Sequence, residues 1–148
     1  MRFALRLDPR FRFALYGVFA LLVLTGAVWL VADQFKEAPE GELWQRVSAS
    51  TLMIHGGVAM ITLLLIGALF PLHVRLGWRG GRNRITGPAM MAFNAVLILT
   101  AFGLYYSGSD AVRPWMSNVH IVVGFALPAL FLVHVLLGRR SRSNGTVS

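Results

Sequence analysis

Four long runs of uncharged, mainly apolar residues organise this chain, and short polar segments separate them. The uncharged runs cover 13–32, 47–74, 85–109 and 114–138. Each run reaches or exceeds the roughly 20 residues that an α-helix needs to cross the hydrocarbon core of a bilayer. The pattern predicts an all-α protein, a transmembrane four-helix bundle with helices at about 11–32, 47–74, 85–108 and 114–138.

Composition supports the same class of protein. Hydrophobic residues make up 56% of the 148 residues and charged residues 14%, which favours a single transmembrane domain over 1–148, in contact with membrane lipid. The net charge of +8 does not indicate a nucleic-acid partner, because the basic residues lie at the ends of the predicted helices. The absence of cysteine excludes disulfides, thiolate metal sites and covalently attached c-type haem.

The distribution of Lys and Arg predicts the orientation. The N-terminal segment, the loop between the second and third predicted helices and the basic tail at 139–148 hold 11 of the 14 basic residues. Basic residues are retained on the cytoplasmic side, so both termini and the tail are predicted to be cytoplasmic. The second and fourth helices then both run from the outer to the inner surface.

The four histidines of the chain form two pairs, one on the second and one on the fourth predicted helix. His55 and His73 are 18 residues apart, which is five helical turns, so both lie on one face about 27 Å apart. His120 and His134 are 14 residues apart and return to within about 40° of one face, about 21 Å apart. The predicted orientation places His55 level with His120 in the outer half, and His73 level with His134 in the inner half.

Two histidines at each level suit haem better than zinc. Zinc takes three or four protein ligands, and no Cys, Asp or Glu lies within the predicted helices to complete a set. A porphyrin supplies four equatorial nitrogens, so the protein need only provide one axial ligand on each side. Two imidazoles from facing helices of a bundle are sufficient for that.

Short segments of the chain resemble known haem proteins. The His-x13-His arrangement from His120 to His134 resembles the haem-bearing helix of bacterial respiratory cytochrome b subunits. FPLHVRLGW at 70–78, NRITG at 83–87 and LYY at 104–106 resemble a family of small bacterial four-helix, cytochrome b-like membrane proteins. The resemblance covers nearly the whole chain and implies a multi-pass protein of the bacterial inner membrane. It also implies bis-histidine ligation of two b-type haems by His55, His73, His120 and His134.

One spacing departs from that pattern. Di-haem helices of this kind keep their two histidines 13 or 14 residues apart, whereas His55 and His73 are 18 apart, a mismatch of about 6 Å along the axis. Pro71 lies two residues before His73 and removes a backbone donor, which bends a helix. A bend there is expected to bring His73 level with His134; without it, at least one haem, the outer one, keeps two histidine ligands.

The resemblance implies a function in electron transfer, to or from quinone or an extracytoplasmic redox partner. With both axial positions filled, iron has no open site for a substrate, so we expect an electron-transfer subunit that is not catalytic alone. The loops are too short for a flavin or iron–sulfur domain, and partner subunits are expected. Two alternatives stay open: a proton relay or small transporter that uses the spaced histidines, and a haem-free membrane anchor.

Charged residues near the helix ends are candidates for secondary roles. Membrane topology alone explains most of the basic residues, but some could bind haem propionates: Arg75, Arg79, Arg82, Arg84, Arg139 and Arg140 on the inner side, and Lys36, Arg46 and Arg113 on the outer side. The acids Asp33, Glu37, Glu40, Glu42 and Asp110 gather on the predicted outer side. Quinol oxidation needs a proton acceptor, so any quinone site is expected near the outer haem.

Overall fold

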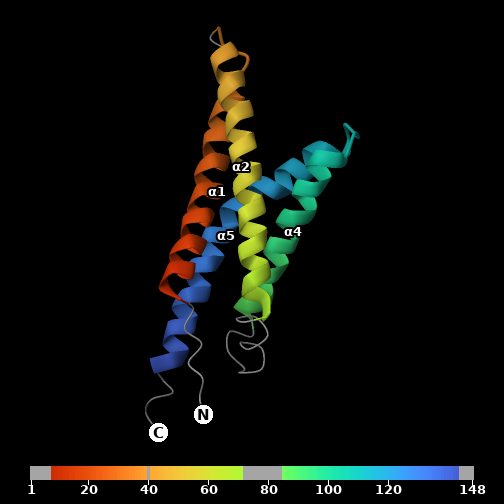
Figure 1. Cartoon of the computed structure of the whole chain (residues 1–148). Helices are drawn as coiled ribbons and strands as arrows, with labels where there is room; N and C mark the ends of the chain where they lie inside the picture. Colours follow the sequence, from red (N-terminus) through yellow and green to blue (C-terminus); the bar gives the residue numbers. More distant parts are fainter. Residues whose placement is uncertain (1–7, 40, 72–84, 144–148) are drawn as a thin grey trace. The chain divides into compact units, whose positions relative to one another are not determined.

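The computed structural model describes residues 8–39, 41–71 and 85–143, with side chains through Gly138 (Figure 1). These ranges contain four α-helices and no strand: α1 Pro9–Phe35, α2 Gly41–Leu69, α4 Thr86–Tyr106 and α5 Val112–Ser143. Each has a stretch long and apolar enough to cross a membrane, which in α5 is Val112–Gly138. The predicted all-α class and the four candidate membrane-spanning helices are confirmed for the described part of the chain, and the cytoplasmic placement of the termini stays a prediction.

The helices form two hairpins, residues 1–73 and 74–148, and each hairpin is described by itself. α1 packs along α2, and α4 packs along α5, as the paired ribbons in Figure 1 show. Within a bilayer, helices associate through close packing and interhelical hydrogen bonds, because lipid is as apolar as the helix surfaces. The contacts inside each hairpin are therefore the structural basis for positioning any site.

Three of the four helices extend past their uncharged runs at one or both ends, whereas α4 lies within its run. α1 begins at Pro9, where the Asp8 carboxylate accepts hydrogen bonds from the backbone N–H groups of Arg10 (2.8 Å) and Phe11 (3.4 Å), and proline suits the first helical position. α2 begins at Gly41, and α5 continues to Ser143 into the predicted tail. Charged residues are good helix formers, so helices extend into segments that lie outside an apolar span.

A tight turn joins α1 to α2. The N–H of Ala38 donates to the carbonyl of Phe35 (3.0 Å), and the N–H of Gly41 donates to the carbonyl of Ala38 (2.8 Å). A Cβ at Gly41 would overlap the Lys36 carbonyl oxygen. Glycine is therefore required where α2 begins.

The end of α2 differs from the prediction. The regular α-helix ends at Leu69, and Phe70 and Pro71 have π-helical hydrogen bonding. Proline lacks the N–H that would continue the α-helical ladder, and a π turn widens the helix locally. His73 and the four arginines from Arg75 to Arg84 lie outside the described residues, so the predicted bend toward the level of His134 stays a prediction.

Candidate functional site

The α1–α2 hairpin holds His55 against a threonine. His55 Nδ1 on α2 lies 2.8 Å from the Oγ1 of Thr25 on α1. The same hydroxyl lies 2.7 Å from the Leu21 carbonyl oxygen and 3.1 Å from that of Leu22, in the preceding turn of α1. The imidazole is therefore held at its Nδ1 edge by the neighbouring helix.

The α4–α5 hairpin repeats this arrangement with different residues. His120 Nδ1 on α5 lies 2.9 Å from the Oγ1 of Thr100 on α4. Thr100 Oγ1 in turn lies 2.7 Å from the Val96 carbonyl oxygen and 3.1 Å from that of Leu97. Two hairpins with different sequences thus present the same hydrogen-bond chain from a helix carbonyl, through a hydroxyl, to an imidazole.

The number of protons available to these hydrogen bonds assigns the tautomers of His55 and His120. The 2.7 Å contact between hydroxyl and carbonyl oxygens needs a proton, and only the hydroxyl can donate it. The contact between hydroxyl oxygen and Nδ1 also needs a proton, which must then come from the ring. Nδ1–H is consequently the donor in His55 and His120. In the neutral form of each ring, Nε2 is then the nitrogen that carries the in-plane lone pair.

A third histidine, His134, has a threonine partner of the same type. His134 Nδ1 on α5 lies 2.9 Å from the Oγ1 of Thr86, the first residue of α4, and Thr86 is buried. No carbonyl contact of the Thr86 hydroxyl is present within the described residues, so the proton in this bond can belong to either group. The contact positions the ring without assigning its tautomer.

The two pairs in the α4–α5 hairpin share one register. Thr86 and Thr100 are 14 residues apart on α4, and their partners His134 and His120 are 14 apart on α5. Equal spacing on two antiparallel helices keeps both pairs in contact at levels about 21 Å apart. Between these levels α5 contains Pro128, yet the register is maintained on both sides of it.

The predicted haem sites would each pair a histidine of one hairpin with a histidine of the other. His55 and His120 belong to different hairpins, and His73 lies outside the described residues. The pairings of His55 with His120 and of His73 with His134 stay predictions. Among the described residues, no group of three or more His, Cys, Asp or Glu side chains could hold a metal ion.

The basic residues predicted on the outer side have local partners. Lys36 Nζ lies 3.0 Å from the Asp33 carboxylate, and Arg46 lies 2.6 Å from that of Glu42. Arg113 donates to the backbone carbonyl of Leu104 (2.7 Å), at the C-terminal end of α4. These contacts give each base a structural role near a helix end, which weakens the case for any of them as a propionate ligand.

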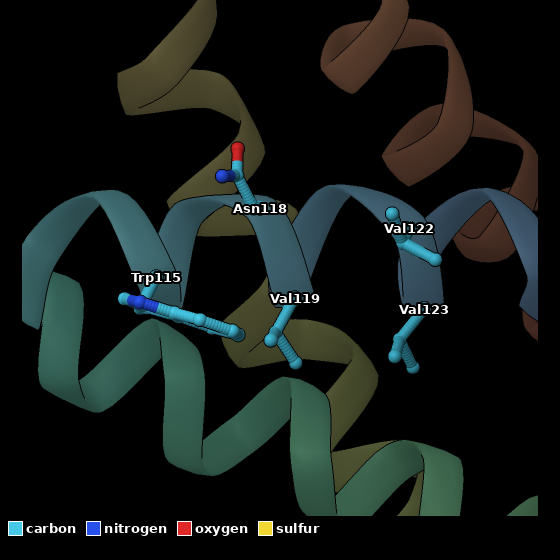
Figure 2. A pocket seen from close by; sticks show the side chains of 5 residues that line it. All are labelled: Trp115, Asn118, Val119, Val122 and Val123. Carbon is cyan, nitrogen blue, oxygen red and sulfur yellow. The ribbon is translucent and has the colours of Figure 1, made fainter.

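A shallow apolar hollow of about 310 Å³ lies on α5 (Figure 2). Its lining residues all come from α5: Trp115, Asn118, Val119, Val122 and Val123. Asn118 projects to the opposite side of the helix from Val119 in Figure 2. The lining surface is apolar, which suits contact with lipid or another helix more than chemistry.

Comparisons with known proteins leave the family unassigned. No family model, no curated protein and no solved structure matches this chain. The resemblance to cytochrome b-like proteins therefore stays an expectation from short segments of the sequence.

Sequence reasoning identified the histidines but missed their threonine partners. One signal was present: Thr25 is the sole Ser or Thr in the uncharged run 13–32. A second was the 14-residue spacing of Thr86 and Thr100, which equals that of His120 and His134. Polar residues inside a membrane span are expensive and usually functional, so both signals pointed to histidine partners on an adjacent helix.

Proposed function

We propose that this protein is a b-type cytochrome of the bacterial inner membrane that carries electrons between two haems, as a subunit of a larger redox complex. The observation that carries the proposal is the repeated threonine–histidine contact, Thr25 to His55 and Thr100 to His120. A histidine that binds a metal through one ring nitrogen commonly donates its other N–H to a fixed acceptor. Both histidines have this acceptor on the adjacent helix.

The donor set suits haem ligation for a chemical reason. An axial ligand must offer a lone pair, and the Nδ1–H tautomer of His55 and His120 places that lone pair on Nε2. When bound, haem supplies a one-electron couple at iron. His55 with His120 would provide the outer pair of ligands and His73 with His134 the inner pair, as the predicted orientation of the two helices pairs them.

The exposed surfaces of the helices are apolar, which suits a subunit within a membrane complex. Large apolar side chains such as Met53, Leu64 and Leu99 are 72%, 76% and 69% exposed, as expected for helices that contact lipid or a partner helix. Two imidazoles on each iron would leave no position for oxygen or substrate. The protein would therefore conduct electrons, with quinone or an extracytoplasmic redox protein as the exchange partner.

An absorption spectrum of the purified full-length protein tests the proposal. We expect sharp visible bands that intensify on reduction, with two haems per chain by extraction and quantification. One haem per chain would retain the outer site only. A colourless protein from haem-replete cells would contradict the proposal and favour the proton relay, the transporter or the membrane anchor.

Acids near the outer helix ends would accept protons if the protein oxidises quinol. Asp33 is already paired with Lys36, whereas Asp110 lies in the α4–α5 connection. If these acids accept quinol protons, loss of both should slow haem reduction by a quinol analogue. Unchanged reduction kinetics in the Asp33→Asn, Asp110→Asn double variant would remove the reason for an outer quinone site.

A further inference from the structure

We infer that Thr25 and Thr100 are positioning residues that set the redox potential of one haem, the outer one. The inference rests on the proposed function and adds residues to it that the histidine pattern alone does not contain. Its basis is the hydroxyl of each threonine, which accepts the Nδ1–H of His55 or His120 while donating to its own helix.

The hydrogen bond would act on a bound iron through the imidazole ring. An Nδ1–H that donates to an acceptor makes the imidazole a stronger electron donor at Nε2. A stronger donor stabilises ferric iron more than ferrous iron, which lowers the midpoint potential. Because the carbonyls of Leu21 and Val96 take the hydroxyl protons, the threonine oxygens remain acceptors in both oxidation states.

The contacts also hold each ring in one orientation. Thr25 is tied to α1 and Thr100 to α4 by bonds to the preceding turn, so the acceptor oxygen cannot rotate without losing its own bond. Second-shell partners of this kind typically contribute 10–100-fold to metal affinity. Thr25 and Thr100 should therefore affect both haem affinity and haem potential.

Paired substitutions separate the effect of each threonine hydroxyl on the haem from any effect on folding. Thr25→Val and Thr100→Val remove the acceptor and keep the side-chain shape, whereas Thr25→Ser and Thr100→Ser restore it. Thr62→Val on α2 is a matched control, because Thr62 is buried and bonds to the Val58 carbonyl (2.8 Å), and it has no hydrogen bond to any of the described histidines.

Redox titration of the full-length protein in lipid nanodiscs gives the first measurement. Each valine variant should raise the midpoint potential of the same haem, by a tenfold change in the ferric-to-ferrous affinity ratio, or about 59 mV for one electron. The serine variants and Thr62→Val should leave it near the wild-type value. An unchanged potential in the valine variants, or an equal shift in Thr62→Val, would overturn the inference. Shifts in two different haems would overturn the assignment of both threonines to one haem.

¹⁵N NMR of histidine-labelled protein gives a second measurement that does not depend on electron transfer. The reduced low-spin protein, or the protein as purified if it is colourless, should show Nδ1–H in His55 and His120. Thr25→Val should alter the His55 signals alone, and Thr100→Val those of His120. Nε2–H in the wild-type rings would overturn the threonine role. Missing haem bands with the expected tautomers would instead contradict the proposed function, so the two failures are distinguishable.

Discussion

Within the described residues, the two hairpins contain different numbers of threonine–histidine contacts. The α4–α5 hairpin has two threonine–histidine pairs, at His120 and His134, whereas the described part of the α1–α2 hairpin has one, at His55. Moving 14 residues from that pair, as in α4–α5, leads to Phe11 on α1 and Leu69 on α2. The second level of the first hairpin is therefore apolar where the second hairpin has a threonine and a histidine.

The same difference appears in the spacing of the histidines, which is 18 residues between His55 and His73 and 14 between His120 and His134. The in-register position, Leu69, is the last residue of regular α-helix, and a π turn at Phe70 and Pro71 follows it. His73 comes four residues after Leu69 in the sequence. Under the proposed pairing, the inner ligand of this hairpin would come from beyond the regular helix, whereas His134 lies within α5.

Removal of the histidines should have the largest effect. His55→Leu and His120→Leu should each lose or alter the same haem and leave the other spectrally intact, because one axial ligand alone cannot maintain a bis-histidine site. His134→Leu should affect the other haem. Haem content should fall from two to one per chain, measured by extraction and visible spectra. If His55→Leu perturbs the haem that His134→Leu perturbs, the level-by-level pairing is wrong.

His73→Leu tests whether the α1–α2 hairpin supplies a ligand to the inner haem. We expect it to affect the same haem as His134→Leu, as seen in the low-spin electron paramagnetic resonance signals of the oxidised protein. Two low-spin haems with unchanged axial ligation would contradict the His73–His134 pairing, and another inner ligand would have to be sought.

A new threonine–histidine pair in the α1–α2 hairpin should partly restore the haem that is lost in His73→Leu. Phe11→Thr with Leu69→His places a threonine and a histidine in the register that Thr25 and His55 already share. We expect recovery of the second haem in the triple variant, measured as haem per chain. Leu69→His without Phe11→Thr is the control and should bind this haem about tenfold more weakly. No recovery in either protein would show that the register of α1–α2 does not extend to this level.

The turns of the two hairpins should differ in their tolerance of an added methyl group. Gly41→Ala forces a Cβ against the Lys36 backbone carbonyl, whereas nothing lies within 4 Å of a Cβ at Gly108 in the α4–α5 connection. Gly41→Ala should destabilise the protein by about 1–3 kcal/mol, and Gly108→Ala by no more than about 0.5 kcal/mol. Thermal unfolding followed by circular dichroism in detergent measures both. Equal stabilities would show that the α1–α2 turn relaxes at little cost.

Thr86→Val should have the smallest effect. It removes one interhelical hydrogen bond, to His134, and such bonds in membrane proteins average about 0.6 kcal/mol. Thr86 is the first residue of α4, and helix ends fray, so a haem bound at His134 should shift its potential less than one bound at His120 does in Thr100→Val. Redox titration of the two variants side by side checks this order, and a larger shift for Thr86→Val would reverse it.

Much of the fold followed from the apolar pattern. The uncharged runs predicted the α1, α2, α4 and α5 spans because a bilayer requires about 20 apolar residues with internal backbone hydrogen bonding. The helix ends did not follow from it. Asp8 and Gly41 set the beginnings of α1 and α2 through local hydrogen bonds and a steric limit, which hydropathy does not register.

The sequence by itself determined that imidazoles at His55, His120 and His134 lie within apolar helices, since residue spacing along one helix sets their levels. Only the tertiary structure decided that Thr25, Thr100 and Thr86 are their partners. The physical reason is that the register between two helices depends on the turn that joins them and on the packing of their side chains. Neither property can be read from the periodicity of one helix, and both determine which nitrogen donates its proton in His55 and His120.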